Sequence, residues 1–321
     1  MADNISTKQN LSDNIDCLAA QRALYSKAKT ISNAQIFLGI PVTVGISIVA
    51  LIWADPALAQ EYHFQPADIS WFVAFLSVIV SLFEFLVFSP WADQTKEEAA
   101  KIQEMFDCAV LDLPWNELVA GGKPDSESVN KHAKAINLNP KEKSRLINWY
   151  PVKLDDLPKH VSRLICQRTN LRWDSELRKE FSFWSILAAV VLFLFLLGLG
   201  IYGDLTIRKF FLLVLAPCLP MFILVFKQWA ENGKASQRLD ELKEFSKSVW
   251  QEVLSCTTDE RSFLERSRKL QDQIFECRKS NPLVFDWFYS LKQSSQQEEM
   301  SYSTDSLIAE YNAAKKEKTP K

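Results

Sequence analysis

The sequence predicts an all-α integral membrane protein, with four transmembrane helices in two hairpins and a helical cytosolic domain. Charged residues make up 24% of the 321-residue chain and the mean hydropathy is −0.07, yet four long stretches hold almost no charge. Lysine and arginine gather in the segments that flank these stretches on one side. Outside the stretches, apolar residues recur at helical spacing, and no useful length alternates as a strand would. The distribution of charge therefore predicts the fold class.

Four segments are apolar enough to cross a membrane. A helix rises about 1.5 Å per residue, so roughly 20 apolar residues cross about 30 Å of hydrocarbon with every backbone amide paired. Glu84 is the single charge in the four segments. The last of them contains Pro217 and Pro220, which would kink it, and a re-entrant segment is the alternative to full crossing. The predicted spans are Ile36 to Ala54, Ile69 to Trp91, Phe181 to Tyr202 and Phe210 to Phe226.

The positive residues predict the orientation of the spans. Residues 92–180 hold fifteen lysines and arginines and residues 227–321 hold sixteen, whereas residues 55–68 hold none. Because basic loops stay on the cytoplasmic side, both termini and the long middle segment should be cytosolic. The predicted domains are a cytosolic N-terminal helix (1–35), a first hairpin (36–91), a cytosolic helical segment (92–180), a second hairpin (181–226), and C-terminal helices with a flexible tail (227–321).

Apolar stripes predict how the cytosolic helices pack. Each stripe needs a partner surface, so the segments should share a core. The last 30 residues are rich in glutamine, glutamate and lysine, and we expect them to be solvated and partly disordered. The stripes are Leu11, Ile15, Leu18 and Tyr25; Val161, Leu164, Ile165 and Leu171; Leu239, Leu242, Phe245, Val249 and Val253; and Phe263, Leu270, Ile274 and Cys277.

Composition and motifs argue against several classes of function. A net charge of −2 gives no positive field for a DNA or RNA duplex. Six scattered cysteines suit reduced thiols in a cytosolic compartment, and three histidines far apart predict no metal site. The chain lacks the glycine-rich, nucleophile-elbow and zinc-protease motifs, so we expect neither an enzyme nor a bound cofactor.

A polar stripe on the second predicted span suggests a path through the membrane. Ser70, Ser77, Ser81 and Glu84 are separated by seven, four and three residues, so they share one helix face. A charge in a span normally faces other helices or water, because facing lipid costs at least about 2.5 kcal/mol. These four residues are the predicted pore lining. In the alternative interpretation, Glu84 lies near the cytosolic interface and forms hydrogen bonds within a helical bundle.

A second group of residues precedes the third span. Arg163, Arg168, Arg172 and Trp173 combine guanidinium groups, which bind phosphates bidentately, with an indole that can stack on a base. The group is therefore a candidate ligand-binding site for a nucleotide. Its alternative is a cationic face beside the membrane.

Three motifs carry a resemblance to a known family. The chain resembles the S-4TM family of four-span, pore-forming effectors associated with cyclic-oligonucleotide-based antiphage signalling in bacteria. The resemblance covers nearly the whole chain and supplies no catalytic residues. The motifs are Leu18-Ala19-Ala20-Gln21-Arg22-Ala23-Leu24-Tyr25, Leu113-Pro114-Trp115-Asn116, and Leu164-Ile165-Cys166-Gln167-Arg168-Thr169-Asn170 followed by Trp173-Asp174.

This resemblance implies a mechanism. A cognate nucleotidyltransferase would make a cyclic oligonucleotide, this activating ligand would reach the chain, and the bacterial inner membrane would be breached, so that infected cells stop growing or die. Because four spans are too few for an evident internal channel, we expect a homo-oligomer in the lipid bilayer with the second span innermost. The alternative is a non-conducting membrane scaffold or sensor that recruits a cytosolic partner.

Overall fold

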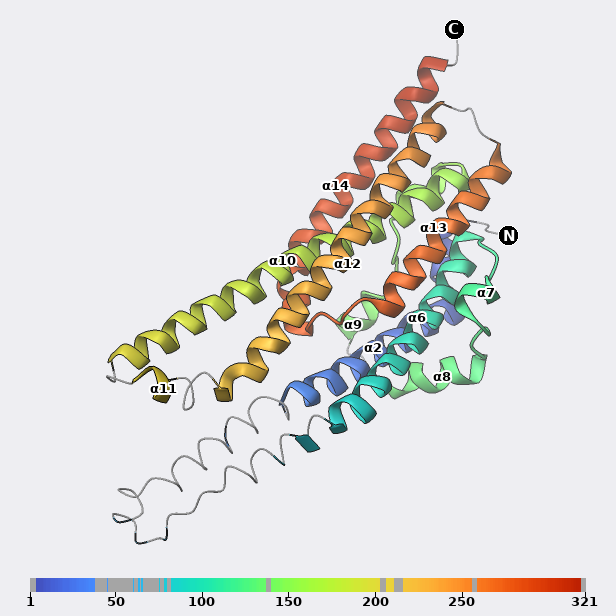
Figure 1. Cartoon of the computed structure of the whole chain (residues 1–321). Helices are drawn as coiled ribbons and strands as arrows, with labels where there is room; N and C mark the ends of the chain where they lie inside the picture. The colour runs from blue at the N-terminus through green and yellow to red at the C-terminus, as the bar shows by residue number, and fades with distance from the viewer. Residues whose placement is uncertain are drawn as a thin grey trace. The chain divides into compact units, whose positions relative to one another are not determined.

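The computed structural model describes residues 4–37, 82–136, 140–202, 206–210, 216–255 and 259–318, with a few single positions between 45 and 79. Every regular element in these ranges is helical, as Figure 1 shows. The all-α prediction is confirmed for this part of the chain. The elements are α1 (Ile5–Gln9), α2 (Ser12–Phe37), the π-helix η2 (Glu84–Phe88), α6 (Ser89–Leu111), α7 (Glu117–Ala120), α8 (Ser126–Ala135), α9 (Pro140–Ser144), the 3-10 helix η3 (Val152–Asp156), α10 (Lys159–Tyr202), α11 (Ile207–Phe210), α12 (Ala216–Ser255), α13 (Glu260–Ser280) and α14 (Asp286–Lys318).

The chain forms two compact units. The first comprises Met1–Lys27, Asp93–Lys179 and Asn232–Lys321, and the second comprises Ala28–Ala92 and Glu180–Glu231. By their bounds, α2, α10 and α12 contribute residues to both units. Which side of the membrane each predicted domain lies on stays a prediction.

Five long helices of the first unit share one apolar core. The predicted stripes on α10 and α13 are confirmed, because all of their residues are buried. Buried core residues include Leu18 and Leu24 of α2, Ile102 and Phe106 of α6, Leu164 and Ile165 of α10, Leu239 and Trp250 of α12, and Leu270 and Ile274 of α13.

Two residues of the predicted stripes are exposed. Leu11 precedes α2, which begins at Ser12, so the helical periodicity does not yet apply to it. Phe245 lies at the edge of the α12 stripe, because each residue turns the helix by about 100° and the buried face is centred on neighbouring positions. Ser246 is buried instead, with its hydroxyl bonded to the Lys243 carbonyl at 2.7 Å.

Local signals set where the helices begin and end. The α6 helix ends at Leu111, just before Pro114, and Asp112 has a φ of 54°. The α10 helix begins directly after Pro158, a residue common at helix starts. The Asp259 side chain accepts a hydrogen bond from the Ser262 amide at 2.7 Å and so caps the start of α13.

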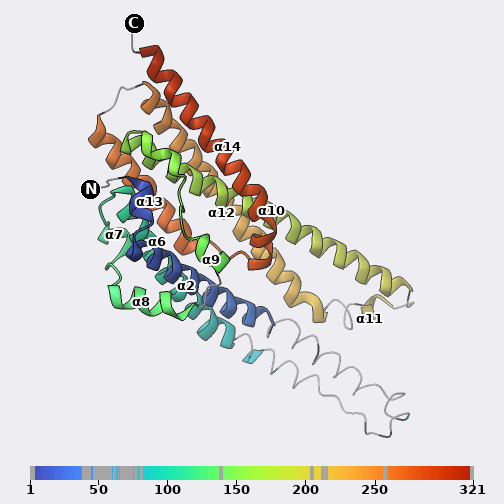
Figure 2. The same ribbon diagram turned by 180° about the vertical axis from the view of Figure 1, so that it is seen from behind.

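The last 30 residues, predicted to be solvated and partly disordered, are helical as far as Lys318, because they belong to α14 (Asp286–Lys318). The prediction of partial disorder is therefore wrong for residues 292–318. Thr304 is buried, and Leu307, Ile308 and Tyr311 pack against the core of the first unit. These four residues lie at helical spacing, so they give the helix a buried face despite the polar composition around them. In Figures 1 and 2, α14 runs alongside α12, and a hydrogen bond from the Trp250 indole to the Glu310 carboxylate joins the two helices.

Among the described residues, α10 is the one helix long and apolar enough to cross a membrane, and little of its apolar stretch is buried. Most of the first two predicted spans lies outside the described residues. Of the fourth predicted span, the structure describes Phe210, the last residue of α11, and the part of α12 from Ala216 on, while residues 211–215 lie outside the described residues. Pro217 is the second residue of α12, where a helix needs no amide donor, whereas Pro220 is the fifth. The four-span layout stays a prediction.

Candidate functional site

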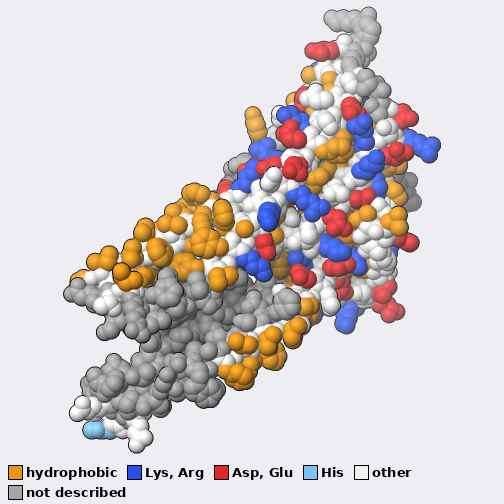
Figure 3. Space-filling view, viewed as in Figure 1, with side chains coloured by type: hydrophobic (Ala, Val, Ile, Leu, Met, Phe, Trp, Pro, Cys, Tyr) orange, Lys and Arg blue, Asp and Glu red, His pale blue; other side chains and the backbone are white. Residues whose placement is uncertain are grey.

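A belt of apolar side chains covers the second half of α10. Residues Phe181 to Tyr202 carry no charge, and many of their large side chains face outward; Val191 and Leu194 are each 58% exposed. Figure 3 shows these side chains gathered along the helix. Exposed apolar patches of this extent are rare on soluble monomers and mark membrane or protein contacts. The exposed residues on this belt are Phe183, Trp184, Leu187, Val190, Val191, Phe193, Leu194, Phe195, Leu197, Ile201 and Tyr202.

The predicted pore lining falls mainly outside the described residues. Ser70, Ser77 and Ser81 are not described, and of Glu84 only the backbone is. Glu84 is the first residue of η2, a five-residue π-helix that leads directly into α6. π-Helical turns are rare and occur often at functional sites. The pore-lining role of these four residues stays a prediction.

A network of buried charges joins α6 to α13 in the first unit. The Asp107 side chain is fully buried and accepts three hydrogen bonds. The donors are the Tyr150 hydroxyl at 2.7 Å, Gln271 Nε2 at 2.9 Å and Arg278 Nη1 at 2.5 Å. Removing one partner of such a buried pair leaves an uncompensated charge, so Asp107 and Arg278 hold the two helices in one register.

Glu104 extends the network by one helical turn. Its carboxylate accepts hydrogen bonds from Arg268 Nη2 at 2.6 Å and from Gln271 Nε2 at 2.8 Å. Gln271 thus bridges both buried carboxylates, and its Oε1 accepts a hydrogen bond from Gln167 of α10 at 3.0 Å. The network therefore connects α6, α10 and α13 through a single glutamine.

Burial and the neighbouring charges shift the pKa values of three residues in the network. Burial raises the pKa of Glu104, and the charge of Asp107 raises it further against the opposing effect of Arg268. Burial also raises the pKa of Tyr150 well above its usual value, with Asp107 adding to the effect. For Arg278 burial acts to lower the pKa, but Asp107 outweighs it and the pKa is raised. Arg278 therefore stays charged and Tyr150 stays neutral, so the ion pair of Arg278 with Asp107 and the hydrogen bond from the Tyr150 hydroxyl are both maintained.

The four predicted ligand-binding residues all lie on α10 and do not share one face. Arg163 is buried, and its Nε donates to the carbonyl of Leu111 at 2.6 Å, where α6 ends. This contact resembles the capping of a helix C-terminus by a basic side chain. Arg172 is exposed and Trp173 is half-buried.

Arg168 contacts a different helix. Its guanidinium carbon lies 5.5 Å from the ring centroid of Trp250 on α12, which is 1% exposed. This geometry is that of a cation–π contact. Arg172 follows Arg168 by four residues, on the same side of α10, whereas Arg163 is turned away from both. The ligand-binding role of the four residues stays a prediction.

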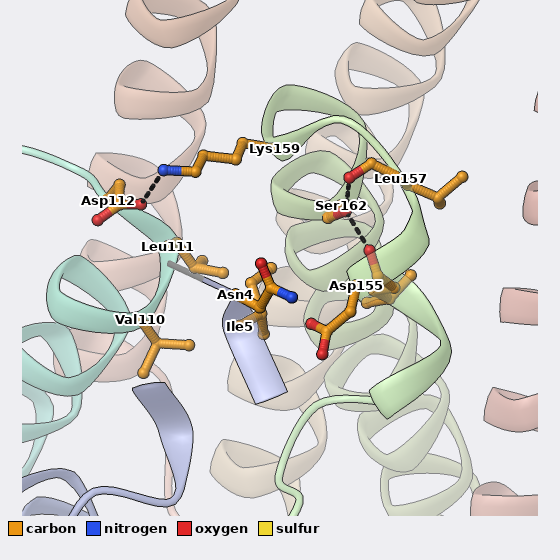
Figure 4. Close-up of a pocket in the computed structure, with 10 residues that line it drawn as sticks. Asn4, Ile5, Val110, Leu111, Asp112, Asp155, Leu157, Lys159 and Ser162 are labelled. Atoms are coloured by element: carbon orange, nitrogen blue, oxygen red, sulfur yellow. Dashed lines mark hydrogen bonds and ion pairs between the residues drawn. The ribbon is translucent and has the colours of Figure 1, made fainter. Parts of the chain in front are cut away.

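A small cavity lies at the start of α10. It measures about 30 Å³, and Figure 4 shows Asp112, Asp155, Lys159 and Ser162 among its lining residues. The Lys159 ammonium group lies 3.5 Å from Asp112, and the Ser162 hydroxyl donates to the Leu154 carbonyl at 2.7 Å. Space of this size suits a single water molecule, so the cavity is too small for a nucleotide.

The sequence reasoning missed the buried charge network. Glu104 and Asp107 lie beside the buried residues Ile102 and Phe106 in the sequence. In α13, buried polar residues likewise recur on the same helix face as the buried apolar stripe. Charges that fall on an apolar face at helical spacing are the signal that could have indicated a buried network. Within the described residues, no cluster of potential metal ligands occurs.

Comparison with known proteins places the chain in a family. The SMODS-associating 4TM effector domain matches residues 3–307. A protein of Bacillus cereus (strain VD146), named "Probable CBASS effector molecule", is 26% identical over 299 residues, which cover 91% of this chain and 94% of that protein. No solved structure matches the chain. With the match extending over nearly its whole length, the chain belongs to the SMODS-associating 4TM effector family.

Proposed function

We propose that this chain is a membrane effector of bacterial antiphage defence. It forms or opens an oligomeric pore in the inner membrane when its cytosolic part senses a cyclic oligonucleotide made by a cognate nucleotidyltransferase. Membership of the SMODS-associating 4TM effector family supports this role, as does the relative named as a CBASS effector. The open pore depolarises the cell, and growth arrest or death then limits the phage by abortive infection.

The apolar belt of α10 is the observation that carries the proposal. Its 22 uncharged residues, Phe181 to Tyr202, would rise about 33 Å as a helix, which matches the hydrocarbon core of a bilayer. Their large side chains face outward. A helix of this length and surface is suited to lipid.

The helices offer a direct route from a cytosolic ligand to the membrane. Gln167 and Val191 belong to the same unbroken helix, α10, so a shift at the charge network can move the apolar belt. Asp107 likewise lies on α6, which follows the π-helical turn that starts at Glu84. A ligand can drive such a shift only through its differential affinity for the two states, and a thousandfold preference corresponds to about 4 kcal/mol.

The pore itself requires several subunits. Four spans per chain are too few for an evident internal channel, so copies of the second span surround an axis and present Ser70, Ser77, Ser81 and Glu84 to the water-filled path. A π-helical turn at Glu84 changes the direction of the side chains after it and so suits a gate.

Membrane depolarisation in bacteria tests the proposal. Cells that express the chain together with its cognate nucleotidyltransferase are followed with a potential-sensitive dye. The wild type should depolarise the cells, and Glu84→Gln should slow this by about tenfold because it removes a charge from the ion path. The matched control is Glu117→Gln on α7, an exposed carboxylate, which should behave as the wild type.

Two results would contradict the proposal. Intact membrane potential in cells that make the ligand would exclude pore formation. If Glu84→Gln is fully active while Leu239→Asp, in the core of the first unit, abolishes the phenotype, the spans only anchor a scaffold that recruits a cytosolic partner.

A further inference from the structure

Arg168 has an unused hydrogen-bond donor. Its Nη1 atom is buried and has no hydrogen-bond partner among the described residues, while the guanidinium lies over the Trp250 ring at 5.5 Å. Burial lowers the pKa of Arg168, with Glu310 and Glu244 opposing the effect. A partly desolvated guanidinium with a free N–H is well suited to bind an anion, because charge-assisted bonds are strong where water is excluded.

The carboxylate of Glu310, on the C-terminal helix α14, contacts the indole of the Arg168–Trp250 pair. The buried Trp250 indole donates from Nε1 to Glu310 Oε2 of α14 at 2.9 Å. The Glu310 side chain is otherwise exposed, so a soluble anion could reach the same donor. Arg172 adds an exposed cation one turn along α10 from Arg168. The contacts of Arg168 with Trp250 and of Trp250 with Glu310 thus bring side chains of α10, α12 and α14 together within the first unit.

Around Glu310, α14 rests on the first unit through a mainly apolar face. Among the described side chains around Glu310, Thr304 is buried, and Leu307, Ile308 and Tyr311 are partly buried against the core. The ion pair between Asp305 and Lys153 is largely exposed, and exposed pairs contribute little to stability. The hydrogen bond from Trp250 to Glu310 adds a direct polar contact between α12 and this stretch of α14.

We propose that Arg168 and Trp250 form a binding site for the phosphodiester group of a soluble nucleotide, which Glu310 of α14 occupies in the resting state. This inference rests on the proposed function, since it assigns the site at which that ligand acts. A phosphodiester accepts the bond from Trp250 Nε1 in place of Glu310 and also pairs the free Nη1 of Arg168. The displaced α14 then leaves α10 free to shift.

The resting contact is tested first, without any ligand. Hydrogen–deuterium exchange of residues 304–311 is measured on the purified full chain in detergent. Glu310→Ala and Trp250→Phe should each raise exchange there by about tenfold, because each removes one partner of the charge-assisted bond. Glu317→Ala removes another exposed carboxylate of α14 and should leave exchange unchanged. Exchange equal to wild type in Glu310→Ala would overturn the resting contact.

The ligand site is tested next with dimethyl phosphate, the smallest phosphodiester anion, against sodium chloride at the same ionic strength. In the wild type the probe should raise exchange of residues 304–311, and Glu310→Gln should lower the required concentration by about tenfold. Arg168→Gln should abolish the response, and Arg168→Lys should weaken it, because lysine keeps the charge but loses the planar fork. Unchanged melting temperatures would show that both variants are folded.

The outcomes separate the site from the function. If Arg168→Gln responds like the wild type, or if Glu310→Gln does not respond to the probe at all, the site is wrong. A response to phosphatidylglycerol in the micelle, without one to dimethyl phosphate, would assign the site to a lipid and overturn the nucleotide source. If cells depolarise normally while these tests fail, this inference alone is lost.

Discussion

The Asp107 carboxylate of α6 lies 2.5 Å from Arg278 of α13, with 0% and 12% of the two side chains exposed. The two residues are 171 positions apart in the sequence. Through this contact the segment that follows the first predicted hairpin is tied to the segment that follows the second. The pair is therefore the most direct measure of how the first unit is held together.

Breaking this pair should destabilise the chain strongly. Asp107→Ala leaves Arg278 buried and unpaired, so the free energy of unfolding should fall by about 3–5 kcal/mol. Asp107→Leu combined with Arg278→Leu should cost less than Asp107→Ala alone, because no charge is then stranded. Urea unfolding of the detergent-solubilised protein, followed by circular dichroism, measures both. Lys247→Ala, which removes an exposed pair with Glu244, should stay within about 0.5 kcal/mol of wild type. A cost that small for Asp107→Ala would contradict the role of the pair.

The Tyr150 hydroxyl should contribute a smaller amount. It donates to Asp107 at 2.7 Å and accepts from Asn170 at 3.0 Å, and the residue is buried. Tyr150→Phe removes only the oxygen and leaves Asp107 with two donors, so the loss should be about 1–2 kcal/mol. The matched control is Tyr302→Phe on α14, where the side chain is 79% exposed and no loss is expected. Equal stability of the two variants in the same urea titration would exclude a contribution from the hydroxyl.

Asp240 should make stability depend on acid pH. Burial acts to raise its pKa, but hydrogen bonds from Lys243, Lys179 and Ser175 outweigh burial and hold the pKa at about 2, below the usual 3.8. The unfolded chain therefore binds the proton first, and the stabilisation is complete above pH 3.8 and lost as the pH falls toward 2. Because more than a third of the side chain is exposed, we expect about 1 kcal/mol after screening.

Comparison with Asp240→Asn isolates this effect from other carboxylates. The wild type should be more stable than the variant at pH 6, and the difference should shrink to near zero at pH 2. Thermal melts of both proteins over this range provide the measurement. A difference that grows on acidification would have the wrong sign for a lowered pKa.

The sequence predicts the apolar helix well and the tail poorly, for the same physical reason. Residues 181–202 can be recognised from the sequence because a helix in lipid is apolar along nearly its whole length, which leaves a continuous apolar run. In α14, by contrast, Thr304, Leu307, Ile308 and Tyr311 are enough to dock the helix on the first unit, and the polar residues between them dominate the composition. A docked helix needs only one apolar face.

The candidate sites could be predicted only in part. Arg168 stands out from the sequence as a phosphate ligand, but its partners Trp250 and Glu310 come from α12 and α14, and no local pattern links them. The network of Glu104 with Arg268 is equally hidden, because the two residues are 164 positions apart. The spacing can indicate that a charge is buried, but only tertiary packing shows which residues surround it.

The apolar belt of α10 should fail to enter the membrane when it is charged. Val191 and Leu194 are three residues apart on one exposed face, and each lysine placed in the middle of a span costs about 2.5–3.5 kcal/mol. Val191→Lys combined with Leu194→Lys should therefore lower the amount of chain in the carbonate-washed membrane fraction, because a chain with one span not inserted is degraded, even though three predicted spans remain. The control combines Leu118→Lys and Ile147→Lys, two exposed apolar residues of the first unit, and should remain membrane-bound. If both double variants stay in the washed membranes at wild-type levels, the belt is not what holds the protein in the bilayer.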